Sequence, residues 1–193
     1  TAIGTVALSS NVEGSYNTIV GAASSYQITT DLNTAVGAYT LNAMTSGDTN
    51  TAIGAISGYS IVEGYNNTLV GAFTMLENDA YNTTAIGAYS CAQVSGANNT
   101  AVGVASLGAC TTGADNTAIG KNAGNGLYDG SRNVILGSIF NYPDVGSGNN
   151  NILLGYNARV KSTNDSYTLV LGNCVGSGSN TTTIDPNFVS GLT

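Results

Sequence analysis

The chain has 193 residues, of which 26 are Gly, 2 are Pro, none is Trp or His, and only 8 % are charged. Such a chain lacks the long charged side chains that cover helices and is rich in residues suited to turns and short strands. The net charge of −7 would repel a phosphate backbone or an anionic membrane surface, and no stretch approaches about 18 consecutive apolar residues, so we expect neither nucleic acid as a partner nor membrane insertion in this segment.

A short phrase, Asn-Thr-(Ala/Ile/Leu)-(Ile/Val)-Gly, recurs as far as residue 172 at intervals of 16 to 18 residues. A repeat of this length is typical of a solenoid rather than of a globular domain. The residue immediately before the repeated Gly is always aliphatic. These residues form a predicted structural ladder, in chain order Ile3, Val20, Val36, Ile53, Val70, Ile86, Val102, Ile119, Leu136, Leu154 and Leu171.

Three further columns precede this ladder. Two positions before the repeated Gly stands a second apolar residue, from Ala2 to Val170. Three positions before it stands Thr, which gives way to Val134, Ile152 and Leu169 toward the C-terminus. Four positions before it the residue is usually Asn, and because stacked Asn side chains can hydrogen-bond along the axis of an assembly, we interpret this column as scaffold.

Each phrase is a short run bounded by Asn and Gly, which predicts a strand of about four or five residues. A small residue three positions after the Gly predicts a second short strand in each unit. A unit of this size cannot bury its own apolar face, so successive units must stack in parallel register. We therefore predict an all-β protein, a parallel β-roll or β-solenoid of about eleven rungs over residues 1–172, with a C-terminal cap or connector over residues 173–193.

Successive side chains of a strand point to opposite faces, so the Thr and ladder columns share one face and the Ala/Ile/Leu column lies on the other. Both faces carry apolar residues, and the pattern leaves open which of them faces the interior. Whichever column lies outside would form an exposed apolar stripe of the kind that marks an interface. We expect three identical chains to meet along it in an intertwined or side-by-side homotrimer.

The phrases Asn-Thr-Ala-Ile-Gly-Ala-Ile-Ser at 50–57 and Asn-Thr-Ala-Val-Gly-Val-Ala-Ser at 99–106 resemble the head repeat of trimeric autotransporter adhesins, the YadA-type head. Similar repeats occur in the tail fibres of bacteriophages and large viruses. The resemblance covers residues 1 to about 172 and implies a left-handed parallel β-roll, three chains around one axis, surface exposure and attachment to a host. The period is longer than in the adhesins, and the chain carries no stalk or membrane anchor, which leaves a bacterial surface and a virion both open.

The residues that usually carry catalysis are sparse. Without His, neither a Ser/His/Asp nor a Cys/His nucleophile can form, and the three cysteines, Cys91, Cys110 and Cys174, have no metal-ligand spacing and are interpreted as filler within the rungs. Acidic residues fall in turns, where a carboxylate typically accepts a hydrogen bond from a neighbouring amide, and they lack the dense spacing that calcium requires. We expect no enzyme activity, no cofactor and no metal.

Four tyrosines are candidates for surface binding. Tyr16, Tyr65, Tyr81 and Tyr167 lie five or six positions ahead of the repeated Gly, in the turn before the strand. An exposed aromatic ring at such a turn can stack on a sugar ring, and it can equally cover the neighbouring rung. The sequence does not decide between these roles.

These observations favour a structural segment of an extracellular trimeric fibre, on a cell surface or a virion, that mediates attachment to a host cell or surface. Its partners would be two copies of itself and a glycan or protein receptor on the host. One alternative is an ice- or surface-binding single-chain β-solenoid, which needs the Thr column outside, although its sharing a face with Ile and Val argues for burial. A second alternative is a carbohydrate-active β-solenoid, which needs carboxylates clustered on one face.

Overall fold

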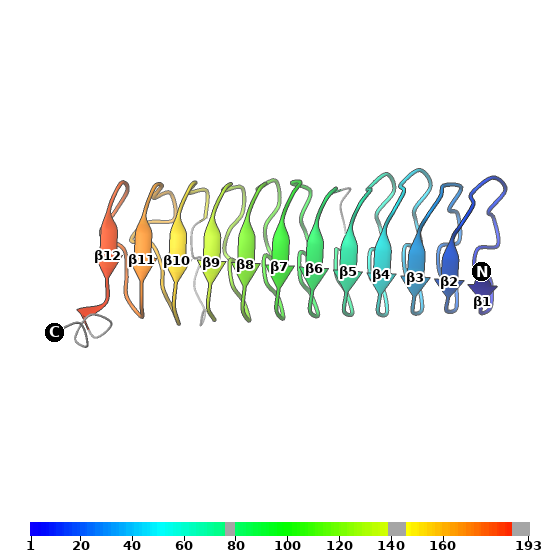
Figure 1. The fold of residues 1–193 in the computed structure, drawn as a ribbon, viewed down its shortest axis with the longest axis horizontal. Coiled ribbons are helices and arrows are strands. Elements are labelled where there is room, and N and C mark those ends of the chain that lie inside the picture. The colour runs from blue at the N-terminus through cyan, green and yellow to red at the C-terminus, as the bar shows by residue number, and fades with distance from the viewer. Residues whose placement is uncertain (76–79, 139–145, 187–193) are drawn as a thin grey trace.

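The protein forms a straight β-solenoid in a computed structural model that describes residues 1–75, 80–138 and 146–186 (Figure 1). Within those residues, twelve short strands build one parallel sheet in chain order, each strand pairing with its neighbours in the sequence. The strands are β1 (Ala2–Ile3), β2 (Thr18–Val20), β3 (Thr34–Val36), β4 (Thr51–Ile53), β5 (Thr68–Val70), β6 (Thr84–Ile86), β7 (Thr100–Val102), β8 (Thr117–Ile119), β9 (Val134–Leu136), β10 (Ile152–Leu154), β11 (Leu169–Leu171) and β12 (Thr182–Ile184).

The sequence columns are the ladder partners of this sheet, which confirms the predicted stacking. In the pairing of β4 with β5, for example, Ile53 lies beside Val70 and Ala52 beside Leu69. The strand β12 lies in the segment that we expected to act as a cap or connector, and it pairs with β11 through Leu171 and Ile184. The sheet therefore continues one rung beyond the last repeated Gly, while residues 187–193 of that segment lie outside the described residues.

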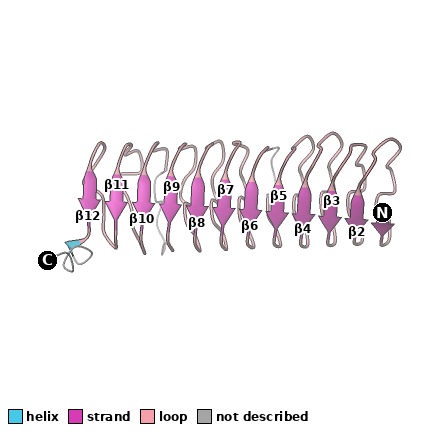
Figure 2. Cartoon of the chain, viewed as in Figure 1, coloured by secondary structure: helices cyan, strands magenta, loops and turns pink. Residues whose placement is uncertain are grey.

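The predicted second strand of each unit is wrong for the described residues, which outside the twelve strands form only the isolated bridges Leu127–Gly146 and Arg159–Val175. After β6, for example, the chain makes two consecutive turns, in which Ser90 N donates to Gly87 O over 3.2 Å and Val94 N donates to Cys91 O over 3.2 Å. We call the second to seventh residues after each repeated Gly the turn side (Figure 2). In the rungs that follow Gly4 to Gly120 its second and fourth residues take positive φ values, 57° at Tyr89 and 51° at Cys91.

This backbone keeps hydrogen bonds between rungs without forming a strand. Tyr89 N donates to Ala72 O of the preceding rung over 3.0 Å, and Cys91 N donates to Ser106 O of the following rung over 2.9 Å. A left-handed residue at alternate positions reverses the chain within a few residues, whereas an extended strand would carry it too far to close so short a rung. The small residue three positions after the Gly, which suggested a strand, is buried inside this turn, as at Ser90.

The core lies between the sheet and the turn side, and the two sides share its volume. Leu69 in β5 lies opposite Gly58, where an added Cβ would stand 3.1 Å from Leu69 Cδ1. One repeat earlier, the position of Leu69 is occupied by Ala52 in β4 and the position of Gly58 by Leu41. Both of these residues are fully buried. A large residue on one side thus accompanies a small one on the other, as close packing requires.

The repeated Gly sets how closely the rungs approach. Gly103 has a φ of 137°, and a Cβ there would stand 2.5 Å from Gly120 O in the next rung. The same backbone approach, closer than 3.0 Å, recurs at every repeated Gly from Gly4 to Gly155. Glycine is needed both for this backbone conformation and for the absence of a side chain.

The Asn column forms a buried hydrogen-bonded ladder, which confirms its interpretation as scaffold. Asn116 Nδ2 donates to Asn99 Oδ1 over 3.1 Å and to Gly130 O over 3.0 Å. Its Oδ1 accepts hydrogen bonds from the main-chain N and the side-chain Nδ2 of Asn133, over 2.9 and 3.1 Å. The Asn116 amide therefore ties three rungs together at the entrance to the strands.

Candidate functional site

The first and third residues of the strands point away from the core and form what we call the outward sheet face. All the predicted ladder residues, from Ile3 to Leu171, lie at the last position of their strands on this face. Ile53 is 41 % exposed and Ile119 44 %, whereas the middle residues of the strands β2–β11 are buried. The structure thus decides the question that the pattern left open, because the Ala/Ile/Leu column faces the interior.

The Thr column lies on the outward sheet face as well. Its sharing a face with Ile and Val argued for burial, and in the single chain that expectation is wrong, since Thr18 and Thr68 are exposed and Thr84 is half-buried. The reason is that the turn side supplies the apolar residues that fill the core, such as Leu41 and Leu107. The strands therefore need only one inward residue each.

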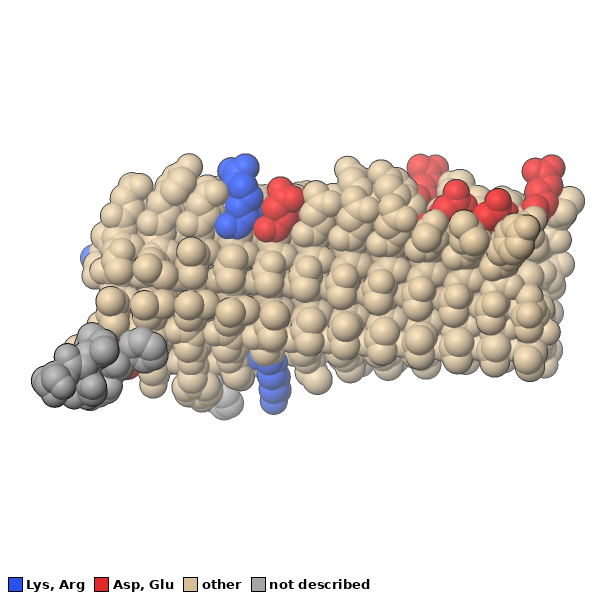
Figure 3. Space-filling model, viewed as in Figure 1, with Lys and Arg blue, Asp and Glu red and all other residues tan. Residues whose placement is uncertain are grey.

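The outward sheet face changes character along the solenoid. From β2 to β8 it alternates Thr with Ile or Val, whereas in β9, β10 and β11 both outward residues are aliphatic. Leu136 in β9 is 37 % exposed and Ile152 in β10 is 42 % exposed. In the space-filling view, charged side chains lie along the upper and lower edges and at the left end, and none is drawn over the strands themselves (Figure 3). The face is an uncharged stripe that becomes more hydrophobic toward the C-terminus.

The four predicted tyrosines do not form one site. The rings of Tyr65 and Tyr81 stack with centroids 5.1 Å apart and an interplanar angle of 7°, so these two cover neighbouring rungs. Tyr16 and Tyr167 are 85 % and 63 % exposed. They belong to turns near opposite ends of the solenoid, before β2 and before β11.

Sequence reasoning missed a second group of aromatic residues, two positions after the repeated Gly on the turn side. Phe73 and Tyr89 stack there with centroids 5.0 Å apart and an interplanar angle of 6°. Tyr39, at the same position of an earlier rung, lies 6.5 Å from Tyr59 at 58°. Alignment on the Gly contains this signal, but the position also holds Ala and Asn, so it does not appear as a column.

The buried cysteine thiols and the turn carboxylates lie in surroundings that suit a structural role. Burial raises the pKa of Cys110 to about 12 and raises that of Cys91 as well, so neither thiol ionises near neutral pH. The predicted capping by turn carboxylates is confirmed at Asp31, whose Oδ1 accepts a hydrogen bond from Ser15 N over 2.6 Å, and at Asp48, whose Oδ1 accepts one from Asp31 N over 3.0 Å.

The described ranges 1–75, 80–138 and 146–186 hold no group of three or more His, Cys, Asp or Glu side chains that could bind a metal ion. Nor do these ranges contain a helix with the length and apolar character to cross a membrane.

The chain matches no protein-family model, and searches of the curated proteins and of the solved structures returned no significant match.

Proposed function

We propose that this chain is a structural segment of an extracellular fibre in which identical chains pack through their outward sheet faces. The observation that carries the proposal is the continuous aliphatic stripe from β2 to β11, which the chain's own core does not need. A stripe of this length in a single soluble chain is the kind of surface that marks an interface.

The area on offer is sufficient for association. A ladder residue such as Ile53 or Ile86 is about 40 % exposed, so its burial would contribute roughly 1 kcal/mol. Summed over the length of the sheet, this is on the order of 10 kcal/mol before the entropic cost of association. Closure by three copies around the long axis would cover every stripe at once, with the tightest packing at β9–β11.

The same proposal places the fibre outside the cell or on a virion, attached to a host cell or surface, with no catalytic role and no cofactor. It is supported by the long uniform rod of roughly 50 Å that eleven rung intervals give. A rod of stacked rungs separates what lies at its two ends, and its long sides offer extended surface to a receptor.

The test is the mass of the purified chain in solution, measured by light scattering. We expect three times the 19.3 kDa of one chain. Replacing Leu136 and Leu154 with Glu should reduce this mass to that of one chain while the circular dichroism spectrum is retained, because both substitutions put charge into the stripe without touching the core. Val12→Glu is the matched control, since Val12 is 85 % exposed away from the strands. A wild-type monomer would refute the proposal.

A surface-binding single-chain solenoid is the second candidate, and one observation favours it. The Thr residues of β2–β8 form a regular outward array, spaced by one rung of about 4.8 Å, that can order water. This function needs a monomer with an open face. It would be supported if a monomeric chain showed thermal hysteresis that Thr84→Tyr and Thr100→Tyr abolish, and it is refuted by a trimer that buries the array.

A further inference from the structure

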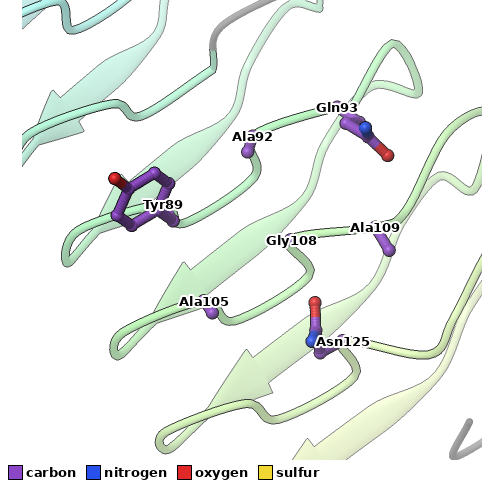
Figure 4. Close-up of a pocket in the computed structure, with 7 residues that line it drawn as sticks. All are labelled: Tyr89, Ala92, Gln93, Ala105, Gly108, Ala109 and Asn125. Carbon is purple, nitrogen blue, oxygen red and sulfur yellow. The ribbon is translucent and has the colours of Figure 1, made fainter.

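A shallow depression interrupts the turn side at the rung that follows Gly103. It has a volume of about 350 Å³ and is lined by Tyr89, Ala92, Gln93, Ala105, Gly108, Ala109 and Asn125 (Figure 4). The depression forms because three turn-side positions of the same rung, Ala105, Gly108 and Ala109, carry small residues. The preceding rung provides Tyr89 and Gln93 as one wall, and the following rung provides Asn125 as the other.

The ring of Tyr89 borders this gap, and it also stacks on Phe73, in the preceding rung, with nearly parallel planes. The next residue of the same column is Ala105, so the aromatic stack stops after two rings and a space one rung high follows. Tyr89 remains 48 % exposed although it stacks on Phe73. The geometry is that of a ring stack with the third ring missing.

Polar groups without charge complete the depression. A Cβ added to Gly108 would stand 2.7 Å from Asn125 Oδ1, which places that carboxamide directly over the floor. Gln93 contributes a second carboxamide at the end of the depression away from Tyr89. None of the seven lining residues carries a charge. Amide groups at such positions can both donate and accept hydrogen bonds.

We propose that this depression binds one residue of a neutral saccharide, whose apolar ring face stacks on Tyr89 while its hydroxyls hydrogen-bond to Asn125 and Gln93. An aromatic face beside a few convergent polar groups is the usual lining of a small-ligand site, and the volume suits one small unit. A nucleotide fits less well, because the lining offers no cation and the chain carries a net charge of −7. The inference deepens the proposed attachment function and rests on it, because it names the class of receptor.

The site lies on the turn side, so chains that pack through the outward sheet face leave it accessible. The two proposals can therefore fail separately. Loss of the trimer would show in the mass of the protein, and loss of the saccharide site would show in the binding experiment alone.

The experiment is a titration of the full chain with the methyl glycosides of glucose, galactose and mannose and with their neutral trisaccharides, followed by ¹H–¹⁵N NMR. We expect saturable shifts of the amides of Tyr89, Ala105, Gly108 and Asn125 for at least one of these probes. Shifts confined to other residues, or no saturable shift with any probe, would overturn the proposal. Binding of indole with no binding of a glycoside would also overturn it, since the slot would then be one for an aromatic side chain.

Two variants separate binding from folding. Tyr89→Ala should weaken binding at least tenfold. Ala105→Tyr should do the same while preserving the fold, because it completes the stack on Tyr89 and its backbone φ of 55° is close to the 57° that Tyr89 itself adopts. Tyr128→Ala is the matched control, as Tyr128 is 52 % exposed and lies outside the lining. Undiminished binding by the folded Ala105→Tyr variant would refute the site.

Discussion

The sheet side and the turn side of this solenoid meet the same requirement, hydrogen bonding to the rungs before and after, with different backbones. The sheet side does so with extended strands and repeats its residues closely, with Gly at its end and Asn at its entrance. The turn side does so with left-handed residues at alternate positions and varies its side chains, from Tyr89 to Ala105 in successive rungs. The comparison suggests that the sheet side determines the fold and that the turn side can vary to produce binding surfaces.

The sharpest way to break this comparison uses two glycines of one rung. Gly103→Ala, on the sheet side, should cost about 3–5 kcal/mol of unfolding free energy, because its φ of 137° is unfavourable for Ala and the Cβ would meet Gly120 O. Gly108→Ala, on the turn side, should cost less than about 1 kcal/mol, since the nearest atom is the end of the Asn125 side chain. Urea unfolding followed by circular dichroism measures both.

Gly178→Ala is a further control for the Gly103 variant. Its φ of 131° is similar, but a Cβ there would meet nothing within 4 Å. The difference between these two variants isolates the clash between rungs from the backbone strain. If Gly103→Ala and Gly108→Ala were equally tolerated, the idea that the repeated Gly sets the rung spacing would be wrong.

The turn-side core should make the protein sensitive to alkali. The pKa of Cys110 is raised from 9.0 to about 12, and that of Cys91 is also raised, chiefly by burial. A raised pKa means that the stability is complete below pH 9 and is lost as the pH rises toward 12, at about 1.4 kcal/mol per pH unit for each thiol. At pH 10.5 the two thiols together should cost roughly 4 kcal/mol relative to pH 8.

The measurement is urea unfolding at pH 8 and pH 10.5 for the wild type and for the Cys91→Ala, Cys110→Ala double variant. All other titrating groups are common to both proteins. The difference between their losses of unfolding free energy from pH 8 to pH 10.5 therefore belongs to the thiols. Equal losses in the two proteins would show that the thiols are not buried as described.

The Asn ladder offers a smaller effect at the junction of the two sides. Asn116→Ala should cost about 2–3 kcal/mol, because it leaves Gly130 O and Asn133 N buried without their side-chain partner. The exposed Asn82, whose Nδ2 donates to Asn98 Oδ1 over 3.1 Å, provides the comparison. Asn82→Ala should lower the unfolding free energy by only about 0.5–1 kcal/mol, which is the preference of Asn over Ala at its φ of 54°. Similar losses at both sites would contradict the distinction between buried scaffold and exposed ladder.

The smallest expected effect is a gain in stability. Thr49 holds a φ of 60°, which a β-branched residue adopts with strain, and the equivalent residue of the next rung is Asn66 at 57°. Thr49→Asn should therefore raise the unfolding free energy by about 0.5–1 kcal/mol, as thermal or urea unfolding would show. The reverse change, Asn66→Thr, should lower it by a similar amount, and an effect of the opposite sign in either variant would contradict the argument.

The sheet side was predictable because each of its positions has one physical requirement. The Gly must lack a Cβ, the Asn must bridge rungs, and the middle strand residue must fit the core, so these positions repeat and the register of β2–β11 follows from alignment alone. The turn side was not predictable in the same way. Its positive φ values are held by residues as different as Tyr39, Cys91 and Ala105, and no sequence signal marks a left-handed backbone imposed by tertiary contacts.

The candidate sites divide in the same way between a predictable sheet side and a turn side that could not be predicted. The ladder residues of the outward sheet face could be listed from the sequence, but the direction they face depends on the turn side, whose Leu41 and Leu107 fill the core in place of the ladder. The depression beside Tyr89 arises because three small residues coincide in one rung. Such a coincidence involves positions that vary independently, so a search for repeats overlooks it.

Among the described residues each strand pairs only with the strands before and after it, and the register is the same from β2 to β11. A duplication of one unit in the gene would therefore lengthen the rod by about 4.8 Å and leave every existing contact in place. A deletion of one unit would shorten it equally. The reach of the molecule can thus evolve in small, nearly neutral increments, while point mutations on the turn side alter what the added length presents.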